Sequence, residues 1–101
     1  MAFSMKIHNK GESNEIIAVC DSALLGKTLN DDEKEIEFLV SPDFYGNETL
    51  EWDEIKIALI RGSNINIIGN DVVELASKEG IINQNNTIDI NGIKHAQVYV
   101  I

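Results

Sequence analysis

A chain of 101 residues with 44% hydrophobic and 25% charged residues, seven glycines and one proline has the size and composition of one folded domain. Eight Lys and Arg against seventeen Asp and Glu give a formal net charge of -9, which excludes broad adsorption to nucleic-acid backbones or to anionic membranes. The one cysteine, Cys20, cannot form an internal disulfide, and the chain shows neither a signal-like start nor a long apolar run. We therefore expect a cytoplasmic protein stabilised by packing.

The first predicted element is a β-hairpin. Three apolar residues alternate with polar ones in the first strand, and residues 15–20 form its partner after a turn near Gly11. With a loop over residues 9–14, His8 lies opposite Glu15. This register places one set of residues on a common face: Phe3, Met5, Ile7, Ile16, Ala18 and Cys20.

The next stretch is predicted to contain a helical turn, an acidic loop and a strand. Asp21 is expected to cap a single turn that ends at Gly26. Residues 30–35 are predicted to form a solvated loop, because they are mostly charged. Residues 36–40 alternate in the manner of a third strand, which Pro42 would end.

A helix is predicted after this strand. Thr49 is expected to cap it, and Gly62 to end it. Acidic residues fall in its first turns, which suits the positive end of the helix dipole. Trp52, Ile55 and Leu59 form its inward stripe.

A second helix is predicted from a Ser63 cap to a stop at Gly80, because five apolar residues fall at helical spacing: Ile65, Ile68, Val72, Leu75 and Ala76. Gly69 within this helix would cost about 1 kcal/mol relative to Ala, which indicates that another backbone lies close by. The alternative is a strand that ends at Gly69 and a short helix from Asp71.

The chain ends in a second hairpin, residues 87–90 and 93–101, around the turn Asn91-Gly92. Its register places Ile90 opposite Ile93 and Ile88 opposite His95. Together these elements predict an α+β fold over residues 1–101, with one domain, about five mostly antiparallel strands and two helices packed on one face.

The sequence Gly26-Lys27-Thr28 resembles the end of a phosphate-binding loop. Asp21 stands where that loop needs its leading glycine, and a carboxylate there would repel a phosphate. We therefore interpret the segment as a helix stop followed by a surface loop, and we reject nucleotide hydrolysis.

A thiol–imidazole or metal site would have to use Cys20, Asp21, His8 or His95. In the predicted hairpin His8 lies roughly 17 Å along the strand from Cys20, so those two cannot form a pair. Only His95 could approach Cys20 and Asp21. The opposing interpretation is a structural, buried thiol, and no metal or cofactor is expected because paired ligand spacing is lacking.

Two surface features point to binding. Phe44-Tyr45-Gly46 follows Pro42-Asp43 in a predicted loop and would present an aromatic platform at the surface, or the loop would fold back with Phe44 as a core plug. A small basic and hydrogen-bonding patch would combine Lys27, Arg61, Lys94, His95 and Gln97. The acidic residues 31–37 are either a solvated face or an electrostatic handle for a basic partner.

Five ordered motifs carry a family resemblance: Lys6-Ile7-His8, residues 18–21 with 24–28, Phe44-Tyr45-Gly46, Asn66-Ile67-Ile68-Gly69 and Gly92-Ile93-Lys94-His95-Ala96-Gln97. The chain resembles small archaeal proteins known as domain of unknown function 424, from Met5 to about Val98, which leaves residues 1–4 outside as an extension. The resemblance implies an archaeal cytoplasmic protein without assigned catalytic residues. By analogy it suggests a role near translation or RNA.

The leading hypothesis is a non-catalytic binding module that contacts RNA or a ribonucleoprotein partner. The candidate binding residues are Cys20, Asp21, Lys27, Thr28, Phe44, Tyr45, Lys94 and His95. One rival is a small thiol-dependent enzyme that uses Cys20 with Asp21 and His95. Another is an acidic interaction scaffold that self-associates through an edge strand such as residues 98–101.

Overall fold

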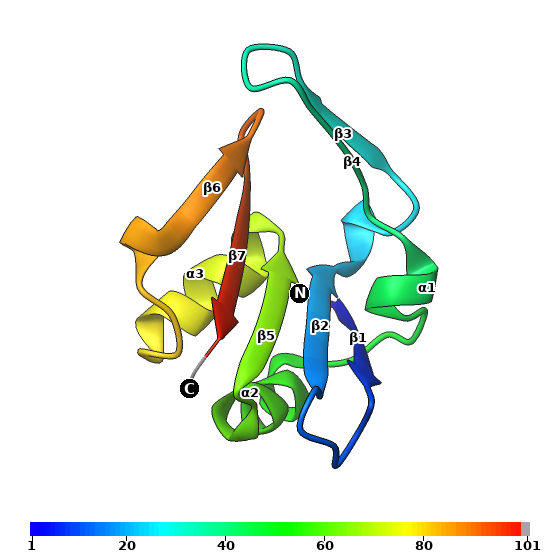
Figure 1. The fold of residues 1–101 in the computed structure, drawn as a ribbon, viewed down its shortest axis with the longest axis vertical. Helices are drawn as coiled ribbons and strands as arrows, with labels where there is room; N and C mark the ends of the chain where they lie inside the picture. Colours follow the sequence, from blue (N-terminus) through cyan, green and yellow to red (C-terminus); the bar gives the residue numbers. More distant parts are fainter. Residues whose placement is uncertain (100–101) are drawn as a thin grey trace.

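The computed structural model describes residues 1–99, and five of their strands form one mixed sheet (Figure 1). The strands are β1 (Phe3–His8), β2 (Ile16–Asp21), β3 (Thr28–Asp31), β4 (Ile36–Leu39), β5 (Asn64–Ile68), β6 (Thr87–Ile90) and β7 (Ile93–Tyr99). The helices are α1 (Pro42–Tyr45), α2 (Trp52–Arg61) and α3 (Asn70–Lys78), with two 3₁₀ turns, η1 (Ser22–Leu24) and η2 (Gln84–Asn86). The sheet order is β1-β2-β5-β7-β6, and only the β2–β5 pair of this sheet is parallel within the described residues.

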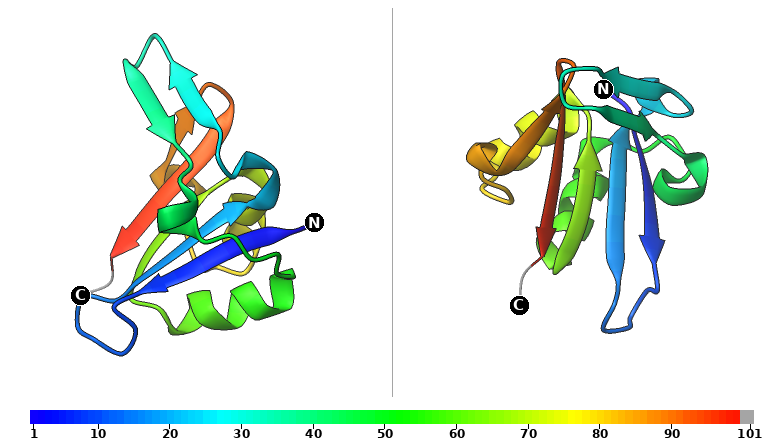
Figure 2. Two further views of the ribbon diagram at one scale, coloured as in Figure 1. Left: turned by 90° about the vertical axis from the view of Figure 1, so that its right-hand side faces the viewer. Right: turned by 45° about the horizontal axis from the view of Figure 1, so that its top comes forward.

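The two faces of the sheet are covered differently. Helices α2 and α3 pack on one face, around a core that includes Phe3, Val19, Ile55, Ile67 and Val72. The other face carries a smaller core under α1 and the separate β3–β4 hairpin. Figure 2 shows α2 on one side of the sheet and this hairpin on the other. The predicted α+β fold, with two helices on one face, is confirmed.

The register predicted for the first hairpin is wrong by one residue. His8 pairs with Ile16 rather than with Glu15, so Ile17 and Val19 share the helix-covered face with Phe3. The loop is one residue longer than predicted, and Asn9 and Gly11 in it adopt φ angles of 53° and 82°. Because both faces of β2 are buried, hydrophobic alternation does not select the register.

The single helix predicted over residues 63–80 is also wrong. Residues 64–68 form β5, and α3 begins after Gly69, which is the alternative left open by the sequence. β5 lies between β2 and β7 at the centre of the sheet, and its isoleucines are buried on both faces. The isoleucines fit helical spacing and strand alternation equally well, so pairing with the neighbouring strands decides in favour of the strand.

Two predicted caps and one predicted loop need correction. The side chain of Asp21 makes no cap hydrogen bond to η1, and α2 begins after Glu51 instead of Thr49. Part of the predicted acidic loop forms β3, which pairs with β4 outside the main sheet. The predicted stop at Gly26 does adopt a left-handed φ of 82°.

The C-terminal hairpin has the predicted register, with Ile90 opposite Ile93 and Ile88 opposite His95. Its last two residues, 100–101, lie outside the described part of the chain. At the other end, Phe3 and Ser4 are buried in β1, so they belong to the fold and are not a loose extension. Within residues 1–99, no helix has the length and apolar composition needed to cross a bilayer.

Candidate functional site

The face of the sheet opposite α2 and α3 is only partly covered. Beyond α1 and the β3–β4 hairpin it presents side chains of three neighbouring strands, which we call the open face: Asn64, Asn66, Ile88, His95, Gln97 and Tyr99. Ile88 is 53% exposed and Tyr99 is 64% exposed. This face therefore combines amides, rings and an exposed aliphatic side chain on a rigid sheet.

A hydrogen-bonded network centres on Asn66 of β5. The hydroxyl of Tyr45 donates to Asn66 Oδ1 at 2.7 Å, and Nε2 of His95 lies 2.9 Å from the same oxygen. Because a carbonyl oxygen only accepts, the His95 ring carries its proton on Nε2. Burial lowers the pKa of His95, which keeps this ring neutral. No residue between 1 and 99 accepts a hydrogen bond from Asn66 Nδ2, so this donor is available to a ligand.

Aromatic and imidazole rings flank the network. His8 stacks on Phe44 with ring centroids 4.7 Å apart, and its Nε2 donates to the Phe44 carbonyl oxygen at 2.7 Å. Phe44 in turn meets Tyr45 edge-on at 4.9 Å. On the other side, the ring of Phe38 lies 5.1 Å from that of His95. The predicted loop is wrong here, because residues 42–45 form α1, and the buried plug is Tyr45 instead of Phe44, which is half-buried.

Tyr45 is fixed by its position in α1. Ser41 caps this short helix by accepting a hydrogen bond from the Asp43 amide, and Pro42 suits its first turn. The buried hydroxyl of Ser4 donates to the Tyr45 carbonyl oxygen at 2.9 Å. Burial raises the pKa of the phenol, which therefore stays protonated and remains a donor toward Asn66.

Cys20 is fully buried under this network. Its neighbours are apolar residues of the smaller core, including Ala18, Val40 and Ile68. Burial, and then the charge of Asp21, raise the pKa of the thiol to about 12. Ile68 pairs with Cys20 on one side and with His95 on the other. His95 is thus two strands, roughly 10 Å, away from Cys20.

The carboxylate of Asp21 performs a structural task. It accepts hydrogen bonds from the amides of Asp71 and Val72, at 3.0 and 2.9 Å, and so caps α3 from the end of β2. Burial raises its pKa, and the two amides act in the opposite direction. The carboxylate occupies the place at this helix start where an anion would otherwise bind.

The predicted cations do not join the aromatic cluster. Lys27 and Thr28 are exposed at the base of the β3–β4 hairpin. Lys94 alternates with His95 along β7, and its side chain lies beside Asn70 and Glu74 on the helix-covered side. Of the eight candidate residues, the structure therefore gathers Phe44, Tyr45 and His95 around Asn66, with Cys20 beneath them.

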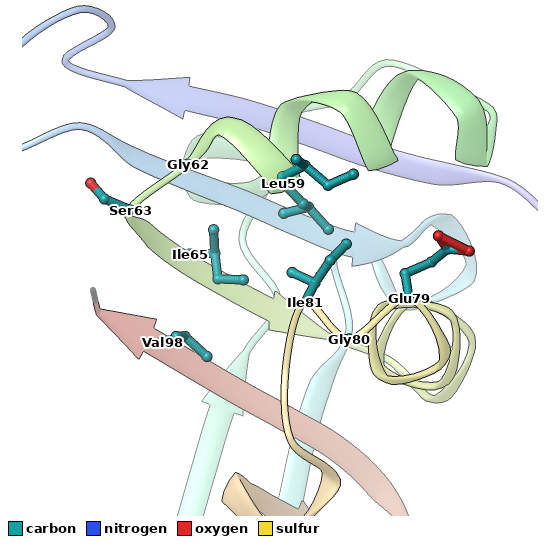
Figure 3. Close-up of a pocket in the computed structure, with 9 residues that line it drawn as sticks. Leu59, Gly62, Ser63, Ile65, Glu79, Gly80, Ile81 and Val98 are labelled. Carbon is teal, nitrogen blue, oxygen red and sulfur yellow. The ribbon is translucent and has the colours of Figure 1, made fainter. Parts of the chain in front are cut away.

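One apolar hollow lies away from this cluster. Leu59, Ile65, Ile81 and Val98 line a space of about 420 Å³ between α2, β5 and the segment after α3 (Figure 3). Glu79 at its rim is paired with Lys56 at 2.8 Å. Within residues 1–99, His, Cys, Asp and Glu side chains form no group of three placed to hold a metal ion.

Asn66 belongs to one of the family motifs, but it is not among the binding residues predicted from the sequence. Strand alternation of Asn64 and Asn66 with Ile65 and Ile67 was the available signal, because it places two amides on one face of a sheet.

Fold and site together define a small α+β domain with a polar and aromatic surface and a sealed thiol. The chain belongs to the family described as "Protein of unknown function (DUF424)", whose model matches residues 8–101. The family resemblance is thus confirmed, with a match that begins at residue 8 rather than at Met5.

A solved structure of similar fold is an uncharacterized conserved protein from Methanopyrus kandleri. It has a TM-score of 0.78 and 24% sequence identity, and the alignment covers 100% of this chain and 93% of that one. At this identity the similarity shows the fold alone. A search of curated proteins found no match.

Proposed function

We propose that this protein is a non-catalytic binding module in information processing, which contacts RNA or a ribonucleoprotein partner through the open face. The observation that carries the proposal is that Asn66 Oδ1 accepts two hydrogen bonds, one from Tyr45 and one from His95. It orients the amide so that Nδ2 is left as a donor. A fixed amide between rings suits recognition of an unpaired base edge.

The electrostatics favour contact with bases over contact with phosphates. A net charge of -9 repels the backbone of a nucleic acid, so affinity has to come from hydrogen bonds and stacking. Asn64 and Gln97 add amide groups to the same face, and the buried Oδ1 of Asn64 has no partner within residues 1–99. We expect a weak dependence of affinity on salt.

The rival enzyme lacks support from the geometry. A catalytic thiol needs access to substrate and a lowered pKa. Cys20 has neither, because it is fully buried and its pKa is raised to about 12. His95 is also engaged with Asn66 and is separated from the sulfur by Ile68.

The test is binding of randomised single-stranded RNA of about 20 nucleotides, compared with a duplex of the same length. Asn66→Asp retains the acceptor for Tyr45 and His95, replaces the Nδ2 donor by an acceptor oxygen and adds one negative charge, and we expect it to weaken binding about tenfold. Asn85→Asp makes the same charge change at an exposed site in η2 and serves as the matched control.

A pull-down from lysate, with and without nuclease, addresses a ribonucleoprotein partner. Enrichment that Asn66→Asp abolishes and Asn85→Asp retains supports the proposal. If neither RNA nor any protein is enriched, or if the two variants behave alike, the open face is not the binding surface.

A further inference from the structure

Strand β7 is longer than the strand that covers its outer side. The β6–β7 pairing ends where Thr87 lies opposite Ala96. β7 continues to Tyr99, with β5 still paired along its inner side as far as the Asn64–Tyr99 pair. Residues 97–99 therefore form an open stretch of sheet edge beyond the end of β6, as Figure 1 shows.

The direction of the backbone groups on this stretch follows from the alternation of a strand. The amide of Lys94 donates to Asn70 Oδ1 at 3.0 Å, and its carbonyl oxygen accepts from the Gly69 amide at 2.9 Å. The backbone of Lys94 thus faces β5 and α3, as do those of Ala96 and Val98 two and four residues later. Gln97 and Tyr99 consequently direct their N–H and C=O groups outward. The β6–β7 register, which ends with Thr87 opposite Ala96, turns the Gln97 N–H toward the Asn86 carbonyl oxygen. Among the described residues, the groups left open on this edge are therefore the Gln97 carbonyl oxygen and the N–H and C=O groups of Tyr99.

A hollow of about 470 Å³ runs beside this edge on the helix-covered side. Val98, Ile81 and Ile82 supply its apolar part, and Gln84 and Asn86 its polar rim. On the opposite side lie the exposed side chains of Gln97 and Tyr99. An added strand, whose side chains alternate between the faces, would place an apolar residue against Val98 and a polar one beside Gln97.

We propose that the open edge at residues 97–99 binds an extended, cationic peptide segment of a partner protein by β-strand addition. The free backbone groups fix the binding mode, and the hollow selects one apolar side chain. The charge of -9 selects the sign of the partner, since it attracts a basic segment and opposes the approach of a second, equally acidic copy. Gln97 and Tyr99 also belong to the open face, but strand addition uses their outward backbone groups and not the Asn66 amide, so each proposal can fail without the other.

The first test is amide hydrogen exchange in the free protein, followed by NMR. The amide of Tyr99 is expected to exchange at least about tenfold faster than those of Ala96 and Val98. The probe is a capped six-residue peptide that alternates lysine with valine. Its addition is expected to slow exchange at Tyr99 and to shift the resonances of Val98 and Ile82.

Matched peptides and variants separate strand addition from charge attraction. A peptide with alternate amides N-methylated keeps its charge but cannot pair, and a peptide that alternates glutamate with valine reverses the charge. Both are expected to bind about tenfold more weakly. Tyr99→Pro removes the outward N–H and should weaken binding similarly, whereas Tyr99→Ala retains this N–H and should bind within about twofold of the wild type.

Three results would overturn the proposal. The first is equal binding of the N-methylated peptide. The second is protection of the Tyr99 amide in a free monomer. The third is a dimer in sedimentation equilibrium whose formation protects this amide, since the occupant would then be a second copy. Because the exchange experiment uses the wild-type protein, misfolding of Tyr99→Pro would not obscure the outcome.

Discussion

Replacement of Gly69 by alanine tests how the end of β2 and the start of α3 are joined. Gly69 has a φ of 129°, and a Cβ atom there would overlap the carboxyl carbon of Asp21 and lie 2.7 Å from its Oδ1. The φ strain costs about 1–3 kcal/mol, and loss of the Asp21 cap costs about 1–2 kcal/mol. Lower entropy of the unfolded chain offsets about 0.4–1 kcal/mol. The expected net loss is about 3 kcal/mol.

Thermal unfolding followed by circular dichroism measures this loss as a decrease in Tm of about 12–24 °C for a domain of this size. Gly80→Ala is the control, because Gly80 has a φ of 73° but nothing within 4 Å of its Cβ position, so only about 1–2 kcal/mol is expected. In an Asp21→Ala background, Gly69→Ala should cost less than in the wild type. Equal costs in both backgrounds, or a loss like that of Gly80→Ala, would refute the proposed collision.

Three further predictions concern the sealed core under the open face. The Cys20 thiol should resist alkylation until denaturant is added. Because the pKa of this thiol is about 12 in the folded protein and lower in the unfolded chain, the free energy of unfolding should fall by about 1.4 kcal/mol per pH unit above about pH 9. This slope should be absent in Cys20→Ala. An NMR titration of His95 should have its midpoint below pH 6.5, and a higher midpoint would contradict the burial argument. The free energy of unfolding should therefore decrease as the pH falls from 6.5 through the lowered pKa of His95. Tyr45→Phe should cost about 1 kcal/mol in urea unfolding, and no loss would mean that the hydrogen bond to Asn66 contributes little.

The sequence predicted correctly those features that depend only on residues close together in the chain. Asn91-Gly92 specifies a two-residue turn, and the flanking pairs follow from it without reference to the rest of the chain. The inward face of α2 and the left-handed Gly26 were predictable for the same reason. The burial of Cys20 was also predicted, from its position in an apolar strand.

Features that depend on contacts between distant parts of the chain could not be predicted from local sequence patterns. The isoleucines of β5 fit a helix or a strand, and only their insertion between β2 and β7 selects the strand. Gly69 signalled a close neighbour, but that neighbour is the carboxylate of Asp21, 48 positions earlier in the chain, and not another backbone. No periodicity in either segment records this contact.

The same insertion of β5 separates the chemistry of the protein into two parts. Had β7 paired directly with β2, His95 would have neighboured Cys20, and a thiol–imidazole pair would have been possible. With β5 between them, Ile68 lies between Cys20 and His95, and the imidazole of His95 donates a hydrogen bond to Asn66 instead. The residues of a thiol–imidazole pair are present in the sequence, but the strand order places one in the core and the other on the open face. The strand order, which the residue types do not determine, thus keeps these two side chains apart.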